Sequence, residues 1–201
     1  MTEVASDQLA GLLAGFTDPV GAAQGCFRAV LDAMSRPGRI VELGVPATAP
    51  AGLSQAAASV MATLADLDTA VWLGAGLDGQ GIAAFVTGQC DAPLAARPAA
   101  AAFALVQAAD LLPLDRFGAG DEAYPDRSTT VIVEGAALGE GPALTLSGPG
   151  IKGSHGLGVG GLPAGFVEAW RQQRAAFPLG VDLVLCTGDR LAALPRSVDI
   201  R

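Results

Sequence analysis

The sequence predicts a layered α/β domain with a mixed sheet, and three observations predict it. Helical and strand-like patterns are interleaved along the chain, as expected for helices that pack on a sheet. With 201 residues, the chain is long enough for one substantial core and too short for two ordinary domains. Hydrophobic residues make up 51% and charged residues 16%, which excludes a disordered chain. We therefore expect a single domain over residues 1–201.

Three helices are predicted in the first third of the chain. The second is the best defined, because Asp18 is a natural N-cap, Pro19 suits the first turn and Pro37-Gly38 ends the helix. The other two are predicted from apolar residues at helical spacing. The first contains Leu9, Leu12, Leu13 and Phe16; the predicted apolar face of the second is Val20, Ala23, Phe27, Val30, Leu31 and Met34; the third contains Leu53, Ala57, Val60, Met61 and Leu64.

Strand patterns begin after the third helix. We expect strands at residues 71–73 and 82–86, then an alanine-rich helix after Pro98. The segments TTVIVEG (129–135) and ALTLSGPG (143–150) are close enough in sequence to form a hairpin. A glycine-rich loop over 148–161 should precede a helix from Pro163 that buries Phe166, Val167 and Trp170, and the final strand is predicted at 181–187. Residues 118–128 are the best candidate for an exposed, mobile loop.

Charge and cysteine content narrow the classes of partner. A formal net charge of −8 argues against nucleic acid and anionic membranes, which need a cationic face. No apolar run approaches the roughly 20 residues of a membrane-spanning helix, and the amino terminus lacks the basic start of a secretory signal, so we expect a cytoplasmic protein. Cys26, Cys90 and Cys186 are far apart in sequence, which favours buried small side chains over a disulfide framework or a metal site.

No set of residues has the pattern of a catalytic centre. The loop GPGIKGSHGLGVGG lacks P-loop spacing, and its GxGxxG match does not follow directly on a strand as in a dinucleotide site. Asp66 and Asp68 suit a turn better than a metal site, and Asp121 with Glu122 suits a solvated loop. His155 is the only histidine and is expected in a loop. We therefore predict no catalytic, cofactor-binding or metal-binding residues.

Two alternatives remain open. Lys152 is the only lysine, so a pyridoxal-phosphate transferase would have to form its Schiff base there. Arg28, Arg36 and Arg39 lie on or just after the second helix, while Arg190 and Arg196 flank the predicted carboxyl-terminal strand. Arginines near a helix end can simply complement its dipole. If the two groups met in space, they would form a clamp for an anion or a carboxylate, or part of an interface.

Four segments resemble one protein family. FRAVLDAMSRPG (27–38), TLADLDTAVWL (63–73), LSGPGI (146–151) and FPLGVDLVL with LAALPRS (177–185 and 191–197) resemble, in this order, the PhnH family, subunits of the bacterial carbon–phosphorus lyase core complex. The resemblance covers nearly the whole chain. Family members continue Pro-Arg with two threonines, where this chain has Ser197 and Val198, so a role that depends on those hydroxyls is in doubt.

The resemblance implies both a fold and a role. It implies three layers, with helices flanking a mixed sheet, similar to the large domain of pyridoxal-phosphate-dependent transferases but without the cofactor site. It implies a homodimer when isolated and the companion subunits PhnG, PhnI and PhnJ. The implied reaction of the assembly replaces the adenine of ATP with a phosphonate. Because the sequence has no coherent set of nucleophile, base and orienting residues, we expect this chain to be a scaffolding subunit without its own active site. Arg28, Arg36 and Arg196 are then the candidate anion or interface residues.

Overall fold

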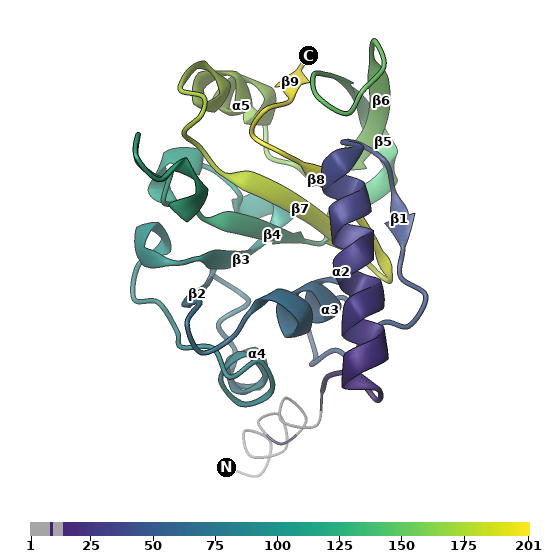
Figure 1. Ribbon diagram of the computed structural model, residues 1–201, viewed down its shortest axis with the longest axis vertical. Helices are drawn as coiled ribbons and strands as arrows, with labels where there is room; N and C mark the ends of the chain where they lie inside the picture. Colours follow the sequence, from purple (N-terminus) through teal and green to yellow (C-terminus); the bar gives the residue numbers. More distant parts are fainter. Residues whose placement is uncertain (1–8, 10–13) are drawn as a thin grey trace.

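The computed structural model describes residue 9 and residues 14–201, which form a central six-stranded sheet with a layer on each face (Figure 1). The helix predicted from Leu9 to Phe16 lies largely outside the described residues. The strand order is β1-β8-β7-β4-β3-β2. Strands β2, β3, β4 and β7 run parallel, whereas β8 and β1 are antiparallel to their neighbours, so the sheet is mixed as predicted. Its strands are β1 (Val41–Glu42), β2 (Val71–Leu73), β3 (Phe103–Gln107), β4 (Thr130–Glu134), β7 (Asp182–Thr187) and β8 (Arg190–Leu194).

One face of the sheet is covered by helices from the first half of the chain. These are α2 (Pro19–Ser35), α3 (Gln55–Leu64) and the short α4 (Gln80–Ala84), which continues as a π-helical turn over Phe85–Gln89. They bury mostly alanine, valine and cysteine side chains against alternate sheet residues such as Leu105, Ile132 and Val184. Small side chains bring these helices close to the strands, which is how a chain with few aromatic residues fills its core.

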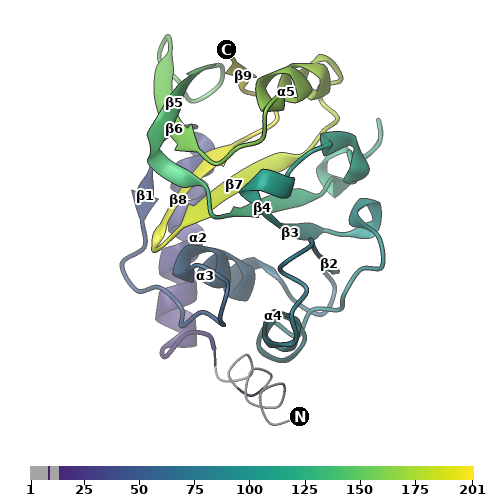
Figure 2. The ribbon, with the colours of Figure 1, turned by 180° about the vertical axis from the view of Figure 1, so that it is seen from behind.

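The opposite face carries α5 (Phe166–Ala175) and a second sheet of three strands, ordered β6-β5-β9 (Figure 2). Its strands are β5 (Ala137–Ser147), β6 (His155–Gly160) and β9 (Asp199–Ile200). Trp170 of α5 is fully buried, and its Nε1 donates a hydrogen bond to the carbonyl of Val198, 2.8 Å away. This bond ties the last strand to the helix, because a buried indole N–H needs an acceptor.

Several predicted elements are confirmed and five are corrected. The predicted second and third helices, the strand at 71–73, the strand at 129–135 and the helix that buries Phe166 and Trp170 are all present. Residues 82–86 are helical, because a short apolar run fits a buried helix as well as a strand. The alanine-rich segment after Pro98 forms one 3-10 turn and then β3, where burial between two parallel strands overrides the helical preference of alanine.

The other corrections concern the second half of the chain. β4 and β5 do not form a hairpin: β4 lies in the large sheet between β3 and β7, and β5 lies in the small sheet. Within the predicted glycine-rich loop, His155–Gly160 form strand β6. The strand at 182–187 is not the last, because β8 and β9 follow it. The segment 118–128 is largely exposed, as predicted.

The buried face of α2 differs from the predicted one. The helix buries Ala22, Cys26, Val30 and Ala33. Three residues of the predicted apolar face are exposed instead: Val20 at 72%, Phe27 at 46% and Leu31 at 51%. These three, which we call the α2 stripe, are spaced at seven and four residues and therefore lie along one side of the helix. The apolar arc of α2 is wider than the sheet beneath it can cover.

The cysteines and the Asp66 turn agree with the sequence prediction. All three cysteines are free and buried. Asp66 accepts hydrogen bonds from the Asp68 backbone N–H and the Thr69 hydroxyl, which is the expected turn. No helix among the described residues is both long and apolar enough to cross a membrane.

Candidate functional site

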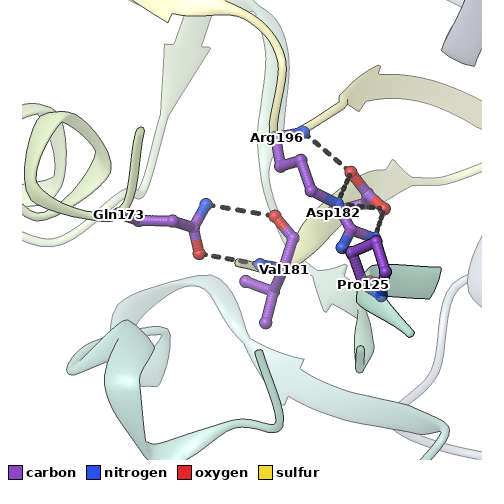
Figure 3. Close-up of polar contacts among 5 residues, drawn as sticks. All are labelled: Pro125, Gln173, Val181, Asp182 and Arg196. Atoms are coloured by element: carbon purple, nitrogen blue, oxygen red, sulfur yellow. Dashed lines mark hydrogen bonds and ion pairs between the residues drawn. The ribbon is translucent and has the colours of Figure 1, made fainter. Parts of the chain in front are cut away.

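Arg196, the candidate residue nearest the carboxyl terminus, has its partners within the chain (Figure 3). Its Nε lies 3.2 Å from each carboxylate oxygen of Asp182, and its Nη2 forms an ion pair with the same group. Its Nη1 donates to the carbonyl of Pro125, 2.6 Å away, and its backbone N–H donates to Asp182 Oδ1 at 2.7 Å. The two side chains are only 15% and 13% exposed. The anion that this guanidinium binds is therefore the carboxylate at the start of β7.

A second polar contact holds the same end of β7. The side-chain amide of Gln173, on α5, accepts a hydrogen bond from the Val181 backbone N–H at 2.9 Å and donates one to the Val181 carbonyl at 3.1 Å (Figure 3). An amide group can satisfy both backbone groups of one residue because it is donor and acceptor at once. Phe-Pro-Leu-Gly and Leu-Pro-Arg-Ser therefore flank the antiparallel pair of strands β7 and β8. The start of β7 is held by α5 on one side and by Arg196 on the other.

Arg36 and Arg39 lie at the carboxyl end of α2, away from Arg196. Both form ion pairs with the carboxylate of Asp32, and Arg39 Nη1 lies 3.2 Å from Asp32 Oδ2. Their side chains are 57% and 56% exposed. Arg28 is exposed two turns earlier on the same helix and makes no ion pair within the described part of the chain. The structure therefore does not bring Arg28, Arg36 and Arg196 together.

The structure instead places Arg36 and Arg39 opposite Lys152 and His155. These four side chains line an open hollow of about 320 Å³, together with Ser154 and with Pro37, Gly150 and Ile151. Arg36, Pro37 and Arg39 line it from the end of α2 and the residues just after it. The other residues come from the loop between β5 and β6 and from His155, the first residue of β6. The only lysine and the only histidine of an acidic chain thus face two arginines across one hollow.

Two glycines set the distance between these walls. Gly38 has φ +83°, and a Cβ there would lie 2.5 Å from Leu146 and 2.9 Å from the ring of His155. Gly150 has φ +82°, and a Cβ there would lie 2.2 Å from the carbonyl oxygen of Ser35. Both positions need the left-handed backbone and the close approach that only glycine allows. The segments MSRPG and LSGPGI therefore pack directly against each other.

The hollow does not have the features of a catalytic centre. None of its lining residues carries a carboxylate or a thiol, and Lys152 and His155 are both exposed. Across the described residues, no group of three or more histidine, cysteine or acidic side chains is placed to hold a metal ion. Gly156 and Gly158 lie within β6, so the GxGxxG match does not form a loop at a helix amino terminus. The arrangement can attract an anion but offers no paired acid and base.

Sequence reasoning missed this hollow for a physical reason. Arg36 and Lys152 are far apart in sequence, and only the packing of Gly38 and Gly150 brings their segments together. The one available signal was that Pro-Gly pairs end both MSRPG and the LSGPG turn, next to the basic residues. Glu134 was missed as well: this buried carboxylate, at the end of β4, accepts hydrogen bonds from the Ser54 backbone N–H at 2.9 Å and hydroxyl at 2.7 Å, at the N-cap of α3.

Comparison with known proteins places the chain in a family. Residues 14–201 match the family model described as bacterial phosphonate metabolism protein (PhnH). The chain is 38% identical over 186 residues to the alpha-D-ribose 1-methylphosphonate 5-triphosphate synthase subunit PhnH of Rhizobium meliloti (strain 1021), a match that covers 92% of this chain and 93% of that protein. A putative C-P lyase subunit protein, HtxG of Stutzerimonas stutzeri, is 42% identical over 76 residues, 38% of this chain and 39% of the relative. The family match over most of the chain and the full-length similarity to a PhnH subunit agree with the resemblance of the four sequence segments, and the chain therefore belongs to the PhnH family.

Proposed function

We propose that this chain is a subunit of the enzyme assembly that forms alpha-D-ribose 1-methylphosphonate 5-triphosphate from ATP and methylphosphonate in phosphonate breakdown. The observation that carries the proposal is its 38% identity to a protein named as a subunit of that synthase, over 92% of this chain and 93% of the relative. A match of this extent leaves little of either chain for an unrelated activity. The companion subunits in the proposal are PhnG, PhnI and PhnJ.

The subunit is proposed to support the reaction without an active site of its own. The three thiols are buried, which removes them as nucleophiles. Lys152 and His155 line the hollow without a carboxylate to orient them, although a positioned base and orienter are what a nucleophilic or acid–base mechanism needs. We therefore propose that the chain contributes its shape and its surface charge to the assembly.

Reconstitution tests this proposal directly. The companion subunits, with and without this chain, are assayed for formation of the ribose 1-phosphonate product from ATP and methylphosphonate, next to the isolated chain. We expect activity only when this chain and its companions are present together. Turnover by the chain alone would contradict the scaffolding role, and full turnover without it would contradict its place in the assembly.

The α2 stripe is the surface proposed to contact a companion subunit. Val20, Phe27 and Leu31 expose apolar area on one side of the helix, and such area is stabilised when a partner removes it from water. Phe27→Glu should therefore weaken co-purification with the companions. Gln172→Glu adds the same charge on α5, across the sheet, and should leave co-purification intact. If Phe27→Glu co-purified with the companions as well as Gln172→Glu does, the α2 stripe would be excluded from the interface.

Three finer proposals follow from the family resemblance. We propose that the isolated chain is a homodimer, that it acts in the cytoplasm, and that its fold is similar to the large domain of pyridoxal-phosphate-dependent transferases. Light scattering on the chain and its Phe27→Glu variant tests the first, and also tells whether the dimer uses the α2 stripe. A dimer unaffected by Phe27→Glu would place the dimer contact elsewhere.

The alternative function, an independent pyridoxal-phosphate transferase, depends on Lys152. This lysine is exposed in a hollow that supplies cations for a phosphate but no carboxylate for the pyridinium nitrogen. Borohydride reduction after incubation with the cofactor, followed by peptide mapping, tests it. A stoichiometric adduct on Lys152 would favour the transferase, and its absence would favour the subunit role.

A further inference from the structure

We propose that the hollow between the end of α2 and the β5–β6 loop is a binding site for a phosphoryl or phosphonyl dianion. Arg36, Arg39, Lys152 and His155 are its ligand-binding residues, and neither Arg28 nor Arg196 belongs to it. The site stands on the charges and contacts described below. Only the assignment of the dianion to the substrate of the assembly rests on the proposed function.

The first argument is the local charge. Arg36, Arg39 and Lys152 are cations around one carboxylate, that of Asp32, which leaves a local charge of about +2. The whole chain has a formal charge of −8, so this hollow runs against the net charge of the protein. A concentration of like charge in a hollow raises the local concentration of the opposite ion. A dianion would neutralise it.

The second argument is that the cationic side chains have hydrogen-bond donors without an acceptor among the described residues. Lys152 and His155 make no side-chain hydrogen bond or ion pair to any residue that the structure describes. Arg36 and Arg39 share the single carboxylate of Asp32, although each guanidinium carries five N–H donors. Arg196 is the contrast within the same chain, because its guanidinium is occupied by Asp182 and Pro125.

The third argument is that the walls are fixed before a ligand arrives. Gly38 packs against His155 and Leu146, and Gly150 packs against the last turn of α2. The Gly38 backbone N–H also donates to the Ala193 carbonyl in β8, which ties the end of α2 to the sheet. A site whose walls are held by the fold loses less entropy on binding than one built on loose loops.

The size and donor set indicate the class of ligand. A hollow of about 320 Å³ is at the small end of ligand pockets, which suits a phosphate or phosphonate group or a short polyphosphate better than a whole nucleotide. Guanidinium forks bind phosphoryl oxygens bidentately, and a lysine adds a point charge. Three cations around one ligand match its two negative charges better than the single charge of a carboxylate.

The test is calorimetry on the full chain at low ionic strength. The probes are methylphosphonate, inorganic phosphate and tripolyphosphate, with acetate as the monocarboxylate control. We expect saturable binding of at least one phosphorus oxyanion in the micromolar to low millimolar range, no binding of acetate, and weakening by added salt. Comparison of the three probes tells whether a single phosphonyl group or a polyphosphate chain is preferred.

Substitutions of the lining residues test whether the anion binds in the hollow. Lys152→Gln and Arg39→Gln should each weaken the preferred probe by about tenfold or more, because each removes a charge-assisted contact. Lys152→Arg should retain most of the affinity, and Arg28→Gln, on the same helix but outside the hollow, should leave it unchanged. Lys152 is exposed, so its variants should fold, and circular dichroism confirms this.

Three results would overturn the proposal: no saturable binding of any phosphorus probe, binding that both hollow variants leave unchanged, or equal weakening by Arg28→Gln. The measurement uses the isolated chain, so its outcome does not depend on the reconstituted activity. If the chain binds phosphonate but does not support the reconstituted reaction, the binding site is supported and the proposed function is contradicted. If the chain supports the reconstituted reaction but binds no probe, only the proposed binding site is contradicted.

Discussion

Replacement of Arg196 by alanine should destabilise the fold and leave anion binding in the α2 hollow intact. The substitution removes the Nε and Nη2 contacts to Asp182 and the 2.6 Å hydrogen bond to the Pro125 carbonyl. It leaves the Asp182 carboxylate, 13% exposed, with only the backbone N–H of residue 196 as its partner. An unpaired charge at such a position is more costly than the pair it came from.

The magnitude follows from that burial. Breaking a fully buried ion pair costs about 3–5 kcal/mol, whereas an exposed pair contributes less than about 1 kcal/mol. Side chains that are 15% and 13% exposed lie nearer the buried limit, and the lost bond to Pro125 adds to the cost. We therefore expect Arg196→Ala to lower the free energy of unfolding by about 2–4 kcal/mol.

Urea unfolding followed by tryptophan fluorescence measures the effect, because Trp170 is fully buried near the same end of the sheet. A double-mutant cycle with Asp182→Ala should give a coupling free energy of about 1–3 kcal/mol. Arg28→Ala, an exposed arginine without an ion pair among the described residues, should change stability by less than about 0.5 kcal/mol. If Arg196→Ala changed stability as little as Arg28→Ala, or if the two substitutions in the cycle were additive, the ion pair with Asp182 would not stabilise the fold. The hypothesis that Arg196 binds an external anion would then regain support.

Three further predictions concern Glu134, Gly150 and Cys90. Glu134→Ala should lower the free energy of unfolding by about 1.5–3 kcal/mol, because it removes Oε2, which accepts both hydrogen bonds from Ser54 at the start of α3; urea unfolding measures it. Glu134→Gln keeps one acceptor oxygen and should cost less. Gly150→Ala should destabilise more than Gly153→Ala in the same assay, since both have positive φ but only the first Cβ would meet backbone; equal losses would contradict the close packing. Burial raises the pKa of the Cys90 thiol from 9.0 to about 12, so above about pH 9 the unfolded chain loses this proton first. Cys90 should then contribute up to about 1.4 kcal/mol per pH unit to a fall in the free energy of unfolding, measured in urea titrations from pH 8 to pH 11. Burial also raises the pKa of the Cys26 and Cys186 thiols, so Cys90→Ala should reduce the fall by the Cys90 contribution and leave the rest.

Elements with strong local signals could be predicted from the sequence. Helix α2 has an N-cap at Asp18 and a Pro-Gly stop, and both of its ends agree with the structure. Strands β4 and β7 are continuous runs of β-branched and leucine residues, as expected for parallel strands buried on both faces. Strand β3 could not be identified, since its segment AAFALVQ favours a helix locally and becomes a strand only between β2 and β4.

The candidate site was harder to predict than the fold, because its residues are contributed by two distant segments. The sequence identified Arg36 as a candidate, but nothing in it says that the β5–β6 loop lies against the end of α2. That contact depends on backbone packing at Gly38 and Gly150, and glycine is so frequent here that no single position is conspicuous. Arg196, which would have completed a clamp with Arg36 had the two met in space, lies near β7 instead.

Arg36 and Arg196 show how the same local sequence can serve two purposes. Each adjoins a proline, in RPG and LPRS, and each lies in a segment that carries the family resemblance. Arg196 is held by Asp182 and Pro125, so its charge is used within the fold. The Arg36 side chain is 57% exposed, shares Asp32 with Arg39, and faces Lys152 across the hollow. Resemblance to the family therefore does not tell an arginine that stabilises the fold from one that binds a ligand. The number of N–H donors without an acceptor inside the protein does distinguish them. By that criterion, the proposed anion site lies at the end of α2.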